Sequence, residues 1–427
     1  MYIYLDKLRI FMAVPGVVKG VVFHIKDHAQ NKLPDKVLGL MKDFRLMVNE
    51  IIRAGILNKV TSKFALCKIV YHGLRKDYDV YSQYIPAACE VAGAILKNYR
   101  KRKRKDPKTE APFVKRLCLK AENQTYKLDR KTGILRLPIR AREHVEIQLC
   151  MSKYHRRYLD DETLKLGSIT VCPGKVVVAF RKTEVPKRPL EGVIALDTNE
   201  RSLDGVLVTK DHGPIPVRLD QKEVPIIQAR HQERRSRLQQ KKSHDRRMKR
   251  KLCGREGRRE HNRIEDRLRK YARVIVMLAM IFNSAIALED LTGMRVRRRR
   301  DKGLNRRLSV WPRRKLHLYI FQLAQWYGVP MIAVNPSYTS TDCPICGRRC
   351  ANSRKDGMFR CVCGWVCDQH LNASLNIHIK AKDSNEELAR ALKGGPDASW
   401  HDLMKSPYDL ETGARMEGNR MSGALGA

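Results

Sequence analysis

The chain has 427 residues and an ordinary hydrophobic fraction of 43%, which is enough for two or three domains with buried cores. Its 86 lysines and arginines outnumber its 45 acids, and the net charge of +41 favours a polyanionic partner, above all nucleic acid. A membrane surface is the alternative, but no basic amphipathic helix with an aromatic opposite face dominates the sequence.

The N-terminus lacks the ordered parts of a secretory signal, and the longest apolar run, 274–288, is too short to span a bilayer. We therefore expect a cytoplasmic protein that makes no membrane contact and associates with the nucleoid. Six of the 12 cysteines lie between Cys343 and Cys367. In a reducing compartment such clustering favours a metal site over disulfides.

The first part of the chain predicts strands followed by helices. Residues 1–30 alternate apolar and polar positions around Pro15-Gly16, which indicates a hairpin or two strands. Helical spacing in residues 31–108 predicts a domain of three or four helices that ends in a basic run. We expect this run to contact phosphates rather than to be only a solvated helix end, and its candidate residues are Arg102, Lys103 and Arg104.

Strand patterns return in residues 109–190, with turns expected at Lys131–Gly133 and at Pro173-Gly174. These strands are expected to complete one β-barrel with residues 1–30, because the N-terminal strands have no other sheet partner nearby. The fold class predicted is a multidomain α+β protein, in which an N-terminal barrel carries a helical insert.

Residues 191–340 change character again. A strand is expected to end at Asp197, and residues 228–273 predict two basic helices joined around Cys253-Gly254. The excess of arginine favours an arm that follows a nucleic-acid backbone over a solvated helical hairpin. The candidate contacts of this arm and of the basic linker behind it are Arg246, Arg247, Arg250, Arg298, Arg299 and Arg300.

The chain then returns to apolar elements. A strand is expected to end at Glu289, a helix to span Arg313–Tyr327, and a further strand to precede the cysteines. Residues 381–427 are polar and rich in glycine, which predicts a disordered tail.

Three carboxylates stand at the ends of rigid elements. Asp197 and Glu289 each close an apolar strand, and Asp368 opens a helix. Carboxylate oxygens that converge can bind Mg²⁺, and a pair of Mg²⁺ ions can activate water and stabilise the leaving oxygen of a phosphodiester. Taken singly, each acid could equally be a helix cap or a surface residue, so the prediction rests on their combination.

The cysteine pairs are the strongest local signal. A C-x₂-C pair and a C-x-C pair, each followed by glycine, are typical of a structural zinc knuckle, with Cys343, Cys346, Cys361 and Cys363 as ligands. Cys350 or Cys367 could replace one of these ligands, although the position of Cys367 beside Asp368 favours a packing role.

Four segments together resemble TnpB, the RNA-guided nuclease of insertion sequences, and the compact type V CRISPR effectors related to it. They are IALDTN within 193–199, ALEDL at 287–291, VNPSYTSTDCPICG at 334–347 and FRCVCGWVCDQHLNASLNI at 359–377. The segments are similar to the three parts of a split RuvC nuclease with a zinc ribbon inserted before the third. The general layout is similar over nearly the whole chain, and the Asp-x-Asn form of the first motif is similar to that of archaeal members.

This resemblance implies a ribonuclease H-like nuclease at 191–340, a zinc ribbon at 341–366 that binds the target nucleic acid, and the third nuclease motif at 367–380. Asp197, Glu289 and Asp368 would be the catalytic residues that bind two Mg²⁺ ions. The N-terminal barrel and helices would hold a guide RNA and read a short motif beside a double-stranded DNA target, whose displaced single strand is cut. No small-molecule cofactor is implied beyond Mg²⁺ and Zn²⁺, and the source would be prokaryotic.

Two departures from the family pattern affect what is expected. The family usually has Asp-Arg-Asp at the third motif where this chain has Asp368-Gln369-His370, and many relatives have C-x₂-C where this chain has C-x-C. The favoured function is an RNA-guided DNA endonuclease. The altered third motif leaves open an RNA-guided repressor whose nuclease is silent. A transposase is a third alternative, but no additional site-specific DNA-binding module or dimerisation helix is evident.

Overall fold

The structure is a computed structural model that describes residues 17–25, 33–186, 188–240, 246–291, 311–350 and 354–393. The chain divides into two compact units, one of residues 15–184 and one that combines 1–14 with 185–427. No helix in the described ranges is long and apolar enough to cross a membrane.

The helical part of the 15–184 unit has three helices, within the number expected. They follow the first strand in the order β1 (Val17–His24), α1 (Asp35–Leu57), α2 (Lys63–Asp77) and α3 (Tyr84–Lys105). Helix α1 buries an apolar stripe at helical spacing, which includes Leu40, Phe44 and Ile51. It packs closely on α3, because a Cβ atom on Gly55 would lie 2.4 Å from Leu96 Cδ1.

The strands of the same unit form two antiparallel sheets. The remaining elements are β2 (Leu119–Ala121), β3 (Lys127–Leu128), β4 (Ile134–Arg140), β5 (Glu143–Gln148), α4 (Lys153–Leu159), β6 (Leu164–Cys172) and β7 (Lys175–Lys182). One sheet has the order β1-β7-β6-β2 and the other β3-β4-β5. The N-terminal strand therefore does pair with the later strands, from Val17 opposite Lys182 to His24 opposite Lys175. Closure into a barrel stays a prediction.

The second unit is built on a five-stranded sheet of order β10-β9-β8-β11-β12. Its strands are β8 (Gly192–Thr198), β9 (Ser202–Thr209), β10 (Ile215–Asp220), β11 (Ser284–Glu289) and β12 (Met331–Val334). The first three are antiparallel neighbours, whereas β11 runs parallel to both β8 and β12. Strands β8 and β11 are almost wholly buried, which explains why their sequences are continuously apolar.

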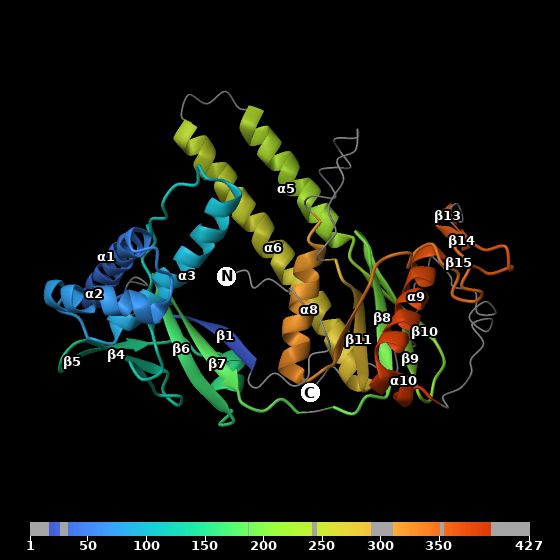
Figure 1. Ribbon diagram of the computed structural model, residues 1–427, viewed down its shortest axis with the longest axis horizontal. Coiled ribbons are helices and arrows are strands. Elements are labelled where there is room, and N and C mark those ends of the chain that lie inside the picture. Colours follow the sequence, from blue (N-terminus) through green and yellow to red (C-terminus); the bar gives the residue numbers. More distant parts are fainter. Residues whose placement is uncertain are drawn as a thin grey trace. The chain divides into compact units, whose positions relative to one another are not determined.

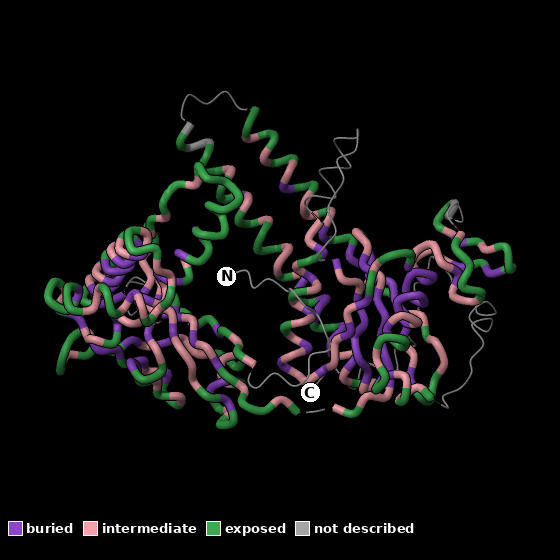
Figure 2. The backbone as a smooth tube through the Cα atoms, viewed as in Figure 1, coloured by how far each residue is buried: buried purple, intermediate pink, exposed green. Residues whose placement is uncertain are grey.

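Helices cover both faces of this sheet (Figure 1). They are α5 (Glu223–Gln240) and α6 (Arg246–Ile281), then α8 (Arg313–Tyr327), α9 (Gln369–Ser384) and α10 (Glu386–Ala391). Leu196 and Leu288 pack toward α6 and α8, and Ala195 and Ala287 pack toward α9. Since side chains alternate along a strand, the next residues, Asp197 and Glu289, lie on the α9 face. Figure 2 shows the sheet as the buried centre of this unit.

The expected joint around Cys253-Gly254 was wrong. Both residues lie inside α6, and α5 and α6 are separated by residues 241–245. A glycine in a helix interior costs only about 1 kcal/mol relative to alanine, and good helix formers surround Gly254. The two helices are also joined by buried groups, because His231 Nδ1 lies 2.7 Å from Glu256 Oε1.

The expected start of the disordered tail was also wrong. Helix α9 continues past residue 381, and Asn385 caps α10 by accepting a hydrogen bond from the Leu388 backbone N–H. Leu388 is 0% exposed and belongs to the core on the α9 face. Residues 394–427 lie outside the described ranges.

The burial of Leu388 predicts that the Leu388→Ala substitution lowers the free energy of unfolding by about 2–5 kcal/mol, because it leaves a cavity in the core. All four tryptophans lie in residues 185–427, so denaturant unfolding followed by tryptophan fluorescence reports on this unit. The control is Leu252→Ala in α6, at a side chain that is 40% exposed and is expected to change little. Equal effects of the two substitutions would contradict the assignment of α10 to the core.

Candidate active site and cysteine cluster

Asp197 and Glu289 are neighbours at the ends of adjacent parallel strands. The preceding residues, Leu196 and Leu288, are paired in register, so the two carboxylates follow at the same level and on the same face. Burial raises the pKa of Glu289, a hydrogen bond from Thr339 Oγ1 at 2.6 Å lowers it, and the charge of Asp197 raises it further. The net shift of the Glu289 pKa is upward, which is the effect expected for two half-buried like charges in proximity.

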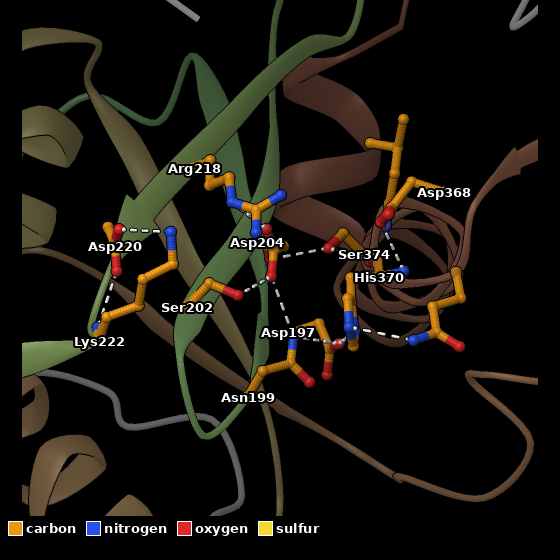
Figure 3. Close-up of polar contacts among 12 residues, drawn as sticks. Asp197, Asn199, Ser202, Asp204, Arg218, Asp220, Lys222, Asp368, His370 and Ser374 are labelled. Atoms are coloured by element: carbon orange, nitrogen blue, oxygen red, sulfur yellow. Dashed lines mark hydrogen bonds and ion pairs between the residues drawn. The ribbon is translucent and has the colours of Figure 1, made fainter. Parts of the chain in front are cut away.

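A fourth acid, Asp204, joins this site from β9, where it lies directly opposite Asp197. Asn199 Nδ2 donates to Oδ2 of both carboxylates, at 3.0 Å each, and Ser202 Oγ donates to Asp204 at 2.5 Å (Figure 3). Arg218 Nε lies 3.4 Å from Asp204 Oδ1. The sequence prediction missed Asp204. The available signal was the short turn between two buried strands, which places residues 197 and 204 opposite each other.

Asp368 and His370 come from the start of α9. Asp368 Oδ1 accepts hydrogen bonds from the backbone N–H groups of His370 and Leu371, at 2.8 and 3.1 Å, and so caps the helix. His370 Nδ1 lies 3.0 Å from Asp197 Oδ2, and Figure 3 shows its ring directed at that carboxylate. Burial lowers the pKa of His370, but the hydrogen bond and charge of Asp197 outweigh burial, so the pKa is raised.

The structure therefore brings two of the three expected acids, Asp197 and Glu289, together. The third, Asp368, is connected to Asp197 through His370, whose backbone N–H donates to Asp368 and whose ring contacts Asp197. Within the described ranges, the cysteines form the one group of three or more potential ligands whose atoms all lie within 4.8 Å of one another. The acidic site nevertheless fits a hard divalent cation in its chemistry. Asp204 is 4% exposed, and its Oδ1 accepts no hydrogen bond from the described residues but lies 3.4 Å from Arg218 Nε. Carboxylate oxygens are the ligands that Mg²⁺ prefers.

The four expected zinc ligands lie together in the short sheet of β13 (Arg354–Lys355), β14 (Met358–Arg360) and β15 (Val366–Asp368) and the loops beside it. The Sγ atoms of Cys343 and Cys363 are 3.6 Å apart, and those of Cys346 and Cys361 are also 3.6 Å apart. A tetrahedral zinc with Zn–S bonds of about 2.3 Å requires sulfur separations of about 3.8 Å. The cluster therefore fits a structural zinc ion.

The two remaining cysteines of this region differ from each other. Cys367 is buried in the core beside Trp365, and burial raises the pKa of its thiol to about 12, which fits the packing role expected for it. Cys350 Sγ lies 3.5 Å from Cys361 Sγ, at the edge of the cluster. Cys350 is therefore the one nearby thiol placed to replace a ligand among the described residues.

The expected nucleic-acid contacts are exposed where the structure describes them. Arg102, Lys103 and Arg104 are exposed in the last turn of α3, and Arg247 and Arg250 are exposed on α6. The side chain of Arg246 and the residues Arg298, Arg299 and Arg300 lie outside the described part. Their contacts with nucleic acid stay predictions.

Comparison with known proteins places these features in context. Residues 314–377 match the model of the Cas12f1-like TNB domain, and residues 40–137 match the model of the uncharacterized protein MJ0013 family. The chain is 29% identical over 273 residues to the TnpB-like protein MJ0751 of Methanocaldococcus jannaschii, which covers 62% of this chain and 94% of that protein. It is 32% identical over 127 residues to the CRISPR-associated endodeoxyribonuclease Cas12f1 of Sulfoacidibacillus thermotolerans, covering 29% of this chain and 28% of that protein.

Solved structures show the same fold. A Cas12f1 chain from a cryo-EM structure of the Cas12f1–sgRNA–target DNA complex aligns with a TM-score of 0.60 at 12% identity, over 87% of this chain and 99% of that chain. The mini-RNA-guided endonuclease CRISPR-Cas phi3 aligns with a TM-score of 0.52 at 12% identity, over 92% and 94%. The fold is thus that of the compact effector proteins, a mixed α/β architecture with a four-cysteine cluster. The sequence matches add that the chain is similar to TnpB-like proteins and contains a match to the Cas12f1-like TNB domain.

The cysteine geometry predicts one zinc ion per chain. Cys343→Ser should lose the zinc and lower the melting temperature, because the ion joins two separate segments of the chain. Cys367→Ser should keep the zinc, although loss of a buried thiol lowers stability, and Cys350→Ser should keep both. The measurement is zinc content by mass spectrometry, together with thermal melting before and after chelation. Because Cys350 is placed to replace a ligand, the decisive variant combines Cys343→Ser with Cys350→Ser, and full zinc content in that double variant would rule out this ligand set.

Proposed function

We propose that the protein is an RNA-guided DNA endonuclease, in which Asp197, Glu289 and Asp368 hold catalytic Mg²⁺ ions on a ribonuclease H-like RuvC sheet. The observation that carries the proposal is the alignment of Asp197 and Glu289 at the same level of two parallel strands. A bound pair of Mg²⁺ ions would supply an activated water and stabilise the leaving oxygen of a phosphodiester. The strand order and the helices on both faces of the sheet support this assignment.

The chain's own residues position the acids. Asn199 donates to Asp197, and Thr339 donates to Glu289, so both carboxylates have fixed orientations. Helix α9 begins beside them, and Asp368 at its N-terminus accepts hydrogen bonds from the backbone N–H groups of His370 and Leu371, so the helix dipole stabilises this third carboxylate.

The partners proposed are a guide RNA, a double-stranded DNA target and the displaced single strand. The net charge of +41 and the names of the similar solved complexes support them. The domains proposed are a wedge barrel of 1–30 with 109–190, a helical recognition domain at 31–108, a nuclease of 191–340 with 367–380, and a zinc ribbon at 341–366. The exposed arginines of α3 and α6 would contact nucleic-acid backbones.

One observation favours the second candidate function, an RNA-guided repressor with a silent or weak nuclease. His370 Nδ1 lies against Asp197 Oδ2, where the imidazole competes with a cation for that oxygen. A repressor would retain binding of the guide and target without cutting.

The nuclease proposal predicts that Asp197→Ala reduces cleavage more than about 100-fold, since loss of groups that only support a ligand already costs 10- to 100-fold. The assay uses protein purified with its co-expressed RNA, a matched DNA with randomised flanking bases, and Mg²⁺. The matched control is Asp220→Asn, an exposed acid on β10 of the same sheet. DNA binding should be unchanged in both variants.

Three results would change the conclusion. Binding without cuts in the unaltered protein, unaffected by Asp197→Ala, would support the repressor. DNA cleavage that persists in Asp197→Ala would contradict the assignment of the catalytic site to Asp197. Strand joining without bound RNA would exclude both functions and support a transposase.

The contact between His370 and Asp197 generates a second prediction. His370→Ala should lower the Mg²⁺ concentration needed for half-maximal cleavage, because it removes one of the two groups that contact Asp197 Oδ2 and leaves only Asn199 there. Asp368→Asn should abolish cleavage and keep the fold, because asparagine caps a helix as well as aspartate does. The measurement is the cleavage rate across a Mg²⁺ titration, with thermal melting in parallel. A higher Mg²⁺ requirement in His370→Ala would show instead that the imidazole positions Asp197.

A further inference from the structure

Tyr338 has an unusual backbone conformation next to the candidate active site. Its φ angle is +65°, in the left-handed region that an aromatic residue rarely adopts. Its side chain is 52% exposed, so the conformation does not serve to bury the ring. Backbone strain of this kind is destabilising and concentrates at functional sites.

The loop that carries Tyr338 is fixed on both sides. The next residue, Thr339, donates its hydroxyl to Glu289 Oε1 at 2.6 Å. Asn376 of α9 donates to the carbonyl oxygens of Thr339 and Asp342, at 2.8 and 2.7 Å. The exposed ring of Tyr338 therefore precedes, by one residue in the chain, the threonine that contacts Glu289 of the candidate active site.

Cations flank the ring. The guanidinium of Arg349 lies 3.3 Å from the ring centroid of Tyr338, and Arg349 Nε donates to Asp342 Oδ1 at 3.1 Å, which fixes it there. Lys380 Nζ donates to the carbonyl oxygens of Asn335 and Ser337, at 3.3 Å for Asn335, and its charge also acts on Glu289. An exposed aromatic ring with a stacked guanidinium and a nearby ammonium is the combination that binds an unpaired nucleotide.

We propose that Tyr338 and Arg349 form a stacking platform for one unpaired base of the target DNA strand. The ring stacks on the base, while Arg349 and Lys380 contact the adjacent phosphates. This platform places the neighbouring phosphodiester at Glu289. The proposal deepens the proposed function and rests on it for the role of the bound strand, but binding at the platform requires no cleavage.

The test measures binding of a short single-stranded DNA that carries one 2-aminopurine, by anisotropy and by fluorescence quenching, without divalent metal. The full-length protein is used with its copurified RNA. Tyr338→Gly removes the ring and relieves the strain at positive φ, so its melting temperature should not fall. Its affinity should fall about 5- to 150-fold, which corresponds to the 1–3 kcal/mol of one stacked base. Tyr338→Phe should bind within about twofold of the unaltered protein, because phenylalanine keeps the stacking face.

Two further arms isolate the base. An oligonucleotide with an abasic position in place of the stacked base should bind the unaltered protein and Tyr338→Gly equally. Ile281→Ala, at an exposed apolar side chain at the end of α6, controls for the general loss of an exposed apolar side chain and should leave affinity unchanged. Unchanged affinity in Tyr338→Gly, or an equal loss with intact and abasic DNA, would overturn the proposal.

The arms also separate this proposal from the nuclease. If the protein never cuts DNA but Tyr338→Gly lowers its affinity for single-stranded DNA, the stacking platform stands and the nuclease proposal fails. If the protein cuts DNA in an Asp197-dependent way but Tyr338→Gly leaves that affinity unchanged, the nuclease proposal stands and the platform fails.

Discussion

Two half-buried carboxylates at adjacent strand ends are the constraint on which this part of the molecule depends. Asp197 and Glu289 occupy the same level of adjacent parallel strands, and the raised pKa of Glu289 reports burial together with the charge of its neighbour. Such a pair is stable only where donors or cations compensate it. Asn199, Thr339 and His370 each supply part of that compensation from a different element. A sheet that formed only a hydrophobic core would not require two acids at adjacent strand ends.

The cysteine cluster is connected to the acids through the chain itself. Cys343 follows the loop that carries Thr339, and the second cysteine pair precedes β15, which ends at Asp368. A zinc ion on these thiolates would therefore fix both segments that lead to the acids. Asn372 and Asn376 of α9 add hydrogen bonds to the carbonyl oxygen of Asp342, at 3.1 and 2.7 Å. The cluster is thus placed to act as a scaffold for the segments that carry the acids.

Much of this arrangement could be predicted from sequence, and the misses have a common physical cause. Strands ending near Asp197 and Glu289 and the helix Arg313–Tyr327 follow from apolar patterns and are present in the structure. The joint between α5 and α6 and the start of the tail were wrong, because a single glycine or a polar composition is a weak local signal that packing overrides. The contacts of Asp204 and His370 were missed because they join residues across strands and over 173 positions of sequence. Periodicity carries no information on such pairings.

The two roles of Asp368, cap and proposed metal ligand, are compatible. Both backbone hydrogen bonds that cap α9 go to Oδ1, so the cap does not use the second oxygen of the carboxylate. A carboxylate held by its own helix N-terminus has a fixed direction, and the helix dipole stabilises its charge. The difference between a working and a silent nuclease then rests on His370, whose ring lies 3.0 Å from Asp197 on the same first turn of α9. A rotation of that side chain would leave Asn199 as the remaining contact of Asp197 Oδ2 and would not disturb the cap of α9. The altered third motif is therefore compatible with an intact scaffold for the acids.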